Sequence, residues 1–180
     1  MKNIFIFFTI IIFILGILLF VENKLSIEKK EIFNNNIIAD ISKLLKETGF
    51  NDEILDGKII VLNLWATWCK PCIEEIPHLN NLVDLYKNEE IIFIALTRET
   101  SDKVNFFLQN KNINFKYMLF YEQIDLYNYF INLKSNKFLK VETLPMNIII
   151  NKDGKLTYLS IGHSNNSIKN LEKSIISSLK

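Results

Sequence analysis

Two cysteines, Cys69 and Cys72, are the residues of this sequence whose type and spacing point most directly to chemistry. They are the only cysteines among the 180 residues, and they lie in the stretch Trp-Ala-Thr-Trp-Cys-Lys-Pro-Cys. The C-x-x-C pair follows a pattern typical of a buried strand and opens a helical one, so the first sulfur is expected at a helix N-terminus. Free backbone N–H groups and the helix dipole favour a thiolate there. The pair therefore predicts exchange of a disulfide with another protein.

Two other uses of a cysteine pair fit the sequence less well. A structural zinc site needs four ligands, usually a second C-x-x-C or a pair of histidines. The two histidines, His78 and His163, lie far apart in unlike contexts and are expected to be surface or structural residues. A purely structural disulfide that closes so short a loop would restrict the unfolded chain little. We therefore expect no metal and no separate cofactor, since the Cys69–Cys72 disulfide is itself the redox group.

The N-terminal segment is apolar from Ile4 to Val21 and is interrupted only by Thr9 and Gly16. Eighteen residues at ~1.5 Å each give roughly 27 Å of helix, just enough to cross a hydrocarbon core. No small-x-small cleavage site follows the segment. The sequence therefore predicts an uncleaved, single-pass signal anchor over residues 1–21, and a removed signal peptide is the alternative.

The basic residues that flank this segment give a mixed indication of orientation. One lysine precedes it and three follow it within ten residues, and this count alone favours a cytoplasmic C-terminal side. A short basic start followed by an apolar core is nevertheless typical of export, and a cytosolic reductase would not need a tether. We expect a bacterial inner-membrane protein whose folded domain faces the periplasm or, more generally, the extracytoplasmic side.

The remaining residues have the size of one ordinary domain. Residues 22–36 are polar and lack periodicity, which indicates a linker before a domain over 37–180. The formal net charge is +1. That charge gives no electrostatic basis for binding nucleic acid.

Hydrophobic periodicity predicts an α/β domain. Nearly continuous apolar runs indicate buried strands, spacings of three and four indicate amphipathic helices, and Lys152-Asp153-Gly154 indicates a hairpin turn. Strands are expected at 59–64, 91–96, 115–120, 146–151 and 156–161, and helices at 37–48, after Cys72, at 101–111 with Ser101 as the cap, at 124–133 and at 168–179. This order predicts a mixed sheet with helices on both faces.

The sequence resembles the membrane-anchored, thioredoxin-like proteins of the TlpA/ResA group. Three blocks carry the resemblance: Val61 to Cys72, then Glu-Ile-Pro-His-Leu at 75–79, then Leu144-Pro145 with the strand and turn that follow. Together they span residues 58–180. The resemblance implies a thioredoxin-like fold preceded by one transmembrane helix.

The resemblance also implies roles for individual residues. Cys69 matches the attacking, exposed cysteine, and Cys72 matches the buried resolving one. Pro145 matches the cis-proline that faces the disulfide in the family, and with Leu144 and Trp68 it is expected to bind the substrate peptide. A cis X–Pro bond is a minority state and is usually functional where it occurs. The alternative for Pro145 is an ordinary proline at a strand edge.

An acidic residue, Glu75, is a further catalytic candidate. Thioredoxin has a buried Asp six residues before its first cysteine, and this chain has Asn63 there, which cannot take a proton. Glu75 lies three residues after Cys72, almost one helical turn on, where the TlpA/ResA group keeps a functional Glu. A carboxylate at this place could shuttle the proton of Cys72. The alternative is a solvated helix residue, as we expect for Glu74.

Together these features predict an extracytoplasmic thiol–disulfide oxidoreductase that acts as a reductant of protein disulfides. By the resemblance, its substrate would be apocytochrome c before haem attachment, and a membrane thiol-electron transporter would return the electrons. Two alternatives stay open at this point. The cycle could run in the oxidative direction, because potential and not sequence sets it. The pair could also be the switch of a redox-sensing binding module.

Overall fold

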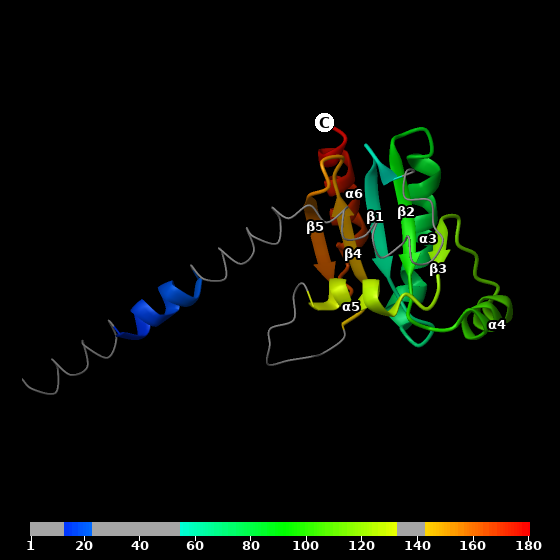
Figure 1. Ribbon diagram of the computed structural model, residues 1–180, viewed down its shortest axis with the longest axis horizontal. Helices are drawn as coiled ribbons and strands as arrows, with labels where there is room; N and C mark the ends of the chain where they lie inside the picture. The colour runs from blue at the N-terminus through cyan, green and yellow to red at the C-terminus, as the bar shows by residue number, and fades with distance from the viewer. Residues whose placement is uncertain (1–12, 23–54, 133–142) are drawn as a thin grey trace, which may run out of the picture. The chain divides into compact units, whose positions relative to one another are not determined.

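The computed structural model describes residues 13–22, 55–132 and 143–180 (Figure 1). The chain divides into two units, Met1–Asn35 and Asn36–Lys180, and the second unit contains the sheet. Its elements in chain order are β1 (Ile59–Leu64), α3 (Lys70–Leu85), β2 (Ile91–Leu96), α4 (Ser101–Lys111), β3 (Met118–Phe120), α5 (Ile124–Asn132), β4 (Met146–Ile150), β5 (Leu156–Ile161) and α6 (Ser167–Ser178).

Five strands form one sheet in the order β3-β2-β1-β4-β5. β1 pairs in parallel with β2, and β2 in parallel with β3. β4 is antiparallel to both β1 and β5, and the β4–β5 connection is the expected hairpin. The sheet is therefore mixed, as predicted. β1 lies at its centre, which explains why all six of its residues are buried.

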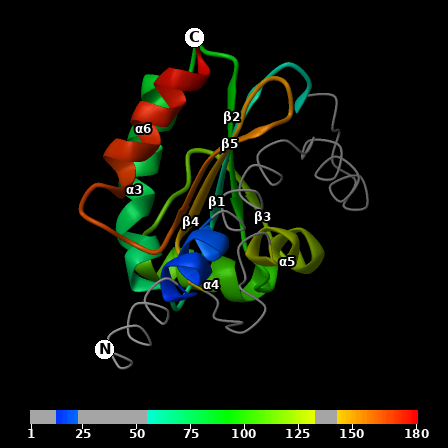
Figure 2. The ribbon, with the colours of Figure 1, turned by 90° about the vertical axis from the view of Figure 1, so that its left-hand side faces the viewer.

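Helices cover both faces of the sheet, as the sequence predicted. α3 and α6 lie on one face, and α5 lies on the other (Figure 2). The core under α3 and α6 is a cluster of buried apolar residues from five elements: Ile59, Val61, Leu79, Leu82, Phe93, Ile149, Leu171 and Ile175. Ile59 and Val61 belong to this cluster because alternate residues of a strand face the same side of a sheet.

Several strand and helix limits in the structure agree with those predicted from the sequence, and others differ. β1, β2 and β5 occupy the expected residues, and α3 continues through Pro77. β3 begins at Met118, three residues later than expected, because only these residues pair with β2. The cap of α4 is Thr100 and not Ser101. Its hydroxyl accepts the backbone N–H of Lys103, which makes Ser101 the first helical residue.

Part of the predicted membrane segment lies within the described residues. Residues 13–22 form a helix with exposed side chains, and residues 4–12 lie outside the description. Across 13–22, 55–132 and 143–180, no helix has both the length and the apolar character needed to cross a bilayer. The helix expected over 37–48 also lies outside the described residues.

Candidate active site

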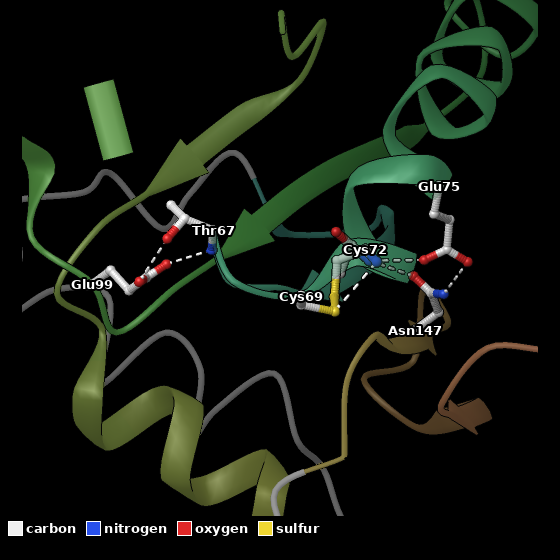
Figure 3. Close-up of a disulfide and its surroundings, with 7 residues drawn as sticks. Thr67, Cys69, Cys72, Glu75, Glu99 and Asn147 are labelled. Atoms are coloured by element: carbon white, nitrogen blue, oxygen red, sulfur yellow. Dashed lines mark hydrogen bonds between the residues drawn. A yellow bond between two sulfur atoms is a disulfide. The ribbon is translucent and has the colours of Figure 1, made fainter. Parts of the chain in front are cut away.

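The cysteine pair lies where β1 passes into α3, as predicted. Cys69 is the N-cap residue of α3, with extended backbone angles, and its Sγ accepts the backbone N–H of Cys72 at 3.2 Å. The two residues form a disulfide, with an S–S distance of 1.97 Å and their Cα atoms 5.3 Å apart (Figure 3). The helix N-terminus therefore stabilises negative charge at the Cys69 sulfur once the bond is reduced.

Both cysteines are buried, so the expectation of an exposed Cys69 was wrong in this disulfide-bonded state, although Cys69 is slightly less buried than Cys72. Cys69 is 5% exposed and Cys72 is 1% exposed. The neighbouring Trp68 is 58% exposed, although Trp is usually highly buried. Trp68 therefore presents an exposed apolar surface immediately before Cys69 in the chain. Its role in substrate binding stays a prediction.

The Leu144–Pro145 peptide bond is cis, which confirms that part of the prediction. Pro145 directly precedes β4 and is buried, and Leu144 is 8% exposed. The carbonyl of Pro145 accepts the backbone N–H of Gly162 at 2.8 Å, which ties this turn to the end of β5. The substrate-binding roles of Leu144 and Pro145 stay predictions.

Glu75 is buried and belongs to a small polar network. It is 1% exposed, which contradicts the alternative of a solvated helix residue. Asn147 of β4 donates from its Nδ2 to Glu75 Oε1 at 2.9 Å (Figure 3). Asn63 of β1 donates from its Nδ2 to Asn147 Oδ1 at 2.8 Å and to Glu75 Oε2 at 3.5 Å. Glu74, by contrast, is exposed at 55%.

The surroundings of Glu75 favour its protonated form. Burial raises the pKa of Glu75, because the interior stabilises the charged carboxylate less than water does. The hydrogen bond from Asn147, the charge of His163 and the hydrogen bond from Asn63 each lower this pKa, but burial outweighs them. A carboxyl group with a raised pKa, almost one helical turn from Cys72, holds a proton more readily than an exposed carboxyl group does and is suited to receive and return one.

A second carboxylate, Glu99, supports the turn before Cys69 and was missed in the sequence. It accepts the backbone N–H of Thr67 at 2.6 Å and the Thr67 hydroxyl at 2.9 Å (Figure 3). Lys103 pairs with it at 2.5 Å. Burial raises the pKa of Glu99, but the hydrogen bonds from Lys103 and Thr67 outweigh burial and the pKa is lowered. Glu99 is therefore a fixed anion that holds the active-site turn.

Sequence signals for Glu99 and Asn147 exist, although they are weak. Glu99 closely follows β2, and the ends of neighbouring parallel strands meet at one edge of a sheet. Asn147 interrupts an otherwise apolar strand. Neither signal indicates the active site until it is known that β2 and β4 both pair with β1.

The histidines do not join the cysteines in a metal site. His78 on α3 and His163 after β5 are both exposed. Within the described ranges, no group of three or more His, Cys, Asp or Glu residues is placed to hold a metal ion. The arrangement of cysteines, buried carboxyl group and cis-proline can instead exchange disulfides, because it provides a nucleophile, a resolving thiol and a proton acceptor.

Comparison with protein families and curated proteins agrees with this chemistry. The family model described as Redoxin matches residues 35–175. ResA, a thiol-disulfide oxidoreductase of Bacillus cereus, is 37% identical over 109 residues, which are 60% of this chain and 57% of the relative. ResA of Bacillus thuringiensis subsp. konkukian is 33% identical over 140 residues, 75% of this chain and 69% of the relative. This chain thus spans little more than half the length of the first of these relatives.

Solved structures show the same fold. A thiol:disulfide interchange protein of the thioredoxin family from Chlorobium tepidum has a TM-score of 0.53 at 20% identity, with 73% of this chain and 86% of that chain covered. A secreted disulfide oxidoreductase of Mycobacterium tuberculosis has a TM-score of 0.51 at 19% identity, with 71% and 87% covered. The fold of residues 55–180, where described, is therefore thioredoxin-like.

Proposed function

This chain belongs to the redoxin family and is ResA-like, and from that premise we propose that it is a thiol–disulfide oxidoreductase that reduces disulfides of other proteins. The observation that carries the proposal is the position of the cysteine pair. Cys69 caps α3 with its sulfur at the helix N-terminus, while Cys72 lies deeper beside a buried carboxyl group. This division provides one sulfur for attack and one for resolution.

The first step is attack on the substrate disulfide. The Cys69 thiolate bonds to one substrate sulfur, and the substrate S–S bond breaks. The second substrate sulfur leaves as a thiolate and takes a proton from water. The helix N-terminus favours the attacking thiolate, so this step needs no separate base. Exposed Trp68 and the turn at Pro145 would bind the peptide that carries the disulfide.

The second step releases the substrate. Cys72 gives its proton to Glu75 and attacks the Cys69 sulfur, so that the Cys69–Cys72 disulfide forms and the mixed disulfide breaks. The remaining substrate sulfur leaves as a thiolate and takes the proton that Glu75 received. Two electrons pass from the cysteine pair to the substrate. An external dithiol then reduces the pair for the next cycle.

The cellular setting extends the proposal. We infer that the N-terminal segment anchors the chain in the inner membrane with the domain on the extracytoplasmic side. A suitable substrate is apocytochrome c, whose C-x-x-C-H cysteines must be reduced before they bond haem. A membrane thiol transporter would supply the dithiol. Support for this setting comes from the apolar segment at 4–21 and from the likeness to ResA.

Trapping of the mixed disulfide tests the chemistry. The full chain with Cys72→Ser, in its thiol form, is mixed with a synthetic oxidised peptide that contains C-x-x-C-H. We expect this variant to accumulate a covalent adduct through Cys69, because the introduced serine hydroxyl cannot resolve it. Cys69→Ser should form little adduct, and the variant with both substitutions provides the background. Stronger adduct formation with Cys69→Ser would reverse the two roles, and absence of turnover by the unmodified protein would overturn the proposed function.

Direction and location need separate measurements. The equilibrium of the Cys69–Cys72 pair with glutathione gives its reduction potential, and a potential more oxidising than that of glutathione would refute the reductant proposal. A reporter that is active only outside the cytoplasm, fused after Lys180, tests the location. Activity of a cytoplasm-dependent reporter alone would contradict the extracytoplasmic placement.

A further inference from the structure

The carboxyl group of Glu75 lies at the polar end of an otherwise apolar layer. Alternate residues of β1 face the same side of the sheet, so Ile59, Val61 and Asn63 share the face that α3 covers. Ile59 and Val61 pack in the apolar core beneath this helix. Asn63, at the same face, meets the carboxyl group and not an apolar side chain. On this face of β1, the polar residue therefore lies where α3 carries Glu75.

The pairing of β1 with β4 places a second amide beside the first. Asn63 and Asn147 are direct partners across the antiparallel strands, two positions along from the partners Val61 and Ile149. Both amides therefore lie on the face of the sheet that α3 covers. They are almost completely buried, at 2% and 1% exposure. Two buried amides and one buried carboxyl group thus form a network with little access to solvent.

Hydrogen bonds in this network run in one direction. Asn63 donates to Asn147, and Asn147 donates to Glu75, at 2.8 and 2.9 Å. This direction suits an ionised carboxylate, which only accepts hydrogen bonds. A protonated carboxyl group carries an O–H that must donate, and a buried donor without an acceptor is costly. A fixed network of this kind would therefore oppose protonation of Glu75.

Side-chain amides can reverse the direction. Rotation of an amide by 180° exchanges its N–H₂ group and its oxygen. After both amides rotate, the protonated Oε1 of Glu75 donates to Asn147 Oδ1, and Asn147 Nδ2 donates to Asn63 Oδ1. Both short hydrogen bonds are kept. The present Oδ1 of Asn63 has no hydrogen-bond partner among the described residues, so no bond to that oxygen is lost. The rotation does give up the 3.5 Å bond from Asn63 Nδ2 to Glu75 Oε2 and moves this buried Nδ2 to a place without an acceptor, and this cost disfavours the rotated arrangement while Glu75 is ionised.

We propose that Asn63 and Asn147 form a reversible amide relay, which positions Glu75 and keeps it hydrogen-bonded both as a carboxylate and as a carboxylic acid. Neither asparagine exchanges a proton itself. The relay deepens the proposed function, and its role in exchange rests on it, because Glu75 must change protonation state in each cycle. Asn suits both positions, whereas Asp would add a second charge and Leu would remove the hydrogen bonds.

Other titratable groups interact with Glu75 and must be separated from the relay. His163 follows β5 and lowers the pKa of Glu75, and Tyr117 precedes β3 and has its own pKa raised by burial and by Glu75. The thiols of Cys69 and Cys72 titrate only in the reduced protein. Oxidised protein is therefore the simpler state for a first measurement, and His163→Gln identifies the contribution of the histidine.

Neutron crystallography of the oxidised, deuterated full chain tests the relay directly. Carbon-13 NMR of the Glu75 carboxyl group first gives the pH midpoint of its titration. Crystals two pH units above and below that midpoint then show where the Nδ2 deuterons of Asn147 point. We expect them toward Glu75 at high pH and toward Asn63 at low pH. The same orientation in both crystals would overturn the relay. This result does not depend on enzymatic activity, so it stands apart from the proposed function.

A functional test uses Asn147→Leu, with Ile149→Val as the matched control on the same face of β4. Loss of the charge-assisted hydrogen bond should raise the midpoint of the pH–rate profile by about 1 pH unit, and the control should leave it unchanged. Adding Glu75→Gln should remove the difference between Asn147→Leu and the parent. An unchanged midpoint in folded Asn147→Leu, with normal exchange by the parent, would overturn the relay's role in exchange and leave the proposed function standing.

Discussion

Two buried carboxyl groups flank the active-site disulfide, and their surroundings differ in a way that separates their roles. Glu75 is 1% exposed and has two amides as hydrogen-bond partners, and its pKa is raised. The side chain of Glu99 is 8% exposed and has an ammonium group, a backbone N–H and a hydroxyl as partners, and its pKa is lowered.

The comparison shows that burial alone does not decide the state of a carboxyl group. Burial raises the pKa at both positions, and the partners decide the outcome. Amides offer partial charges, which do not offset desolvation of Glu75. The ammonium group of Lys103 and the N–H of Thr67 offset it at Glu99. One group can therefore move a proton, while the other keeps its charge and holds the backbone.

The largest expected effect is on the rate of exchange. Glu75→Gln keeps the shape of the side chain and removes its proton chemistry. We expect exchange to slow by about 10- to 100-fold and the pH–rate profile to lose one step, because general acid–base catalysis contributes on this scale. Stopped-flow kinetics with a model disulfide measures both. Glu74→Gln, on the exposed side of α3, is the control, and an unchanged profile in Glu75→Gln would refute the proton role.

Stability should respond more strongly at Glu99. Glu99→Gln places an N–H₂ group among donors and loses the charge that attracts Lys103. We expect a loss of about 1–2 kcal/mol in the free energy of unfolding, the range for hydrogen bonds to charged groups. Urea denaturation measures it, with exposed Glu89→Gln as the control. A loss no larger than that of the control would show that Glu99 does not hold the turn.

The pH dependence of stability should have opposite signs at the two positions. A raised pKa means that the stability contributed by Glu75 is complete below its ordinary value and is lost as pH rises through the folded value. Glu75→Gln should therefore gain in melting temperature relative to the parent as pH rises. A lowered pKa means that the contribution of Glu99 is present above its ordinary value and is lost as pH falls through the folded value.

Melting curves of the parent and both Gln variants, recorded from pH 3 to 8, compare these trends. The melting-temperature deficit of Glu99→Gln should shrink at acid pH. If the two variants change in the same direction relative to the parent, the contrast between the carboxyl groups is wrong.

The smallest expected effect is the change in the free energy of unfolding when Lys103, the cation paired with Glu99, is replaced. Lys103, in the first turn of α4, pairs with Glu99, which lies just before the N-cap residue Thr100, but the Lys103 side chain is 57% exposed. Lys103→Met should therefore cost about 0.5 kcal/mol or less, as for other solvent-exposed ion pairs. The same urea experiment measures it. A loss equal to that of Glu99→Gln would assign the stabilisation to the ion pair and not to the bonds from Thr67.

Local signals predicted much of the fold and the cysteine chemistry. The apolar run at 59–64 and the turn at 152–154 are short-range patterns, and the structure places β1 and the β4–β5 hairpin there. The start of β3 was wrong, because a strand's limits depend on which residues its neighbour pairs. The cap of α4 was wrong by one residue, because Thr100 and Ser101 are chemically equivalent candidates and only the backbone distinguishes them.

The surroundings of the site were less predictable, because they depend on contacts between distant residues. Glu75 was identified from the resemblance to the TlpA/ResA group together with its spacing to Cys72, but its partner Asn147 lies on a strand whose pairing with β1 has no local signature. Glu99 and Lys103 have the spacing of an ordinary surface pair on a helix. The bond from the Thr67 N–H, which gives that pair its structural role, exists only in the folded turn.

The long separation between Glu75 and its amide partner has a consequence for biosynthesis. The disulfide joins residues three apart, whereas the Asn147–Glu75 bond joins residues 72 apart. At about 5–20 residues per second, a ribosome adds Asn147 roughly 4 to 14 s after Glu75. The nascent chain therefore contains both thiols before it contains Asn147, the hydrogen-bond partner of Glu75. An oxidant that reaches the chain in this interval reacts with cysteines whose neighbouring carboxyl group does not yet have this partner.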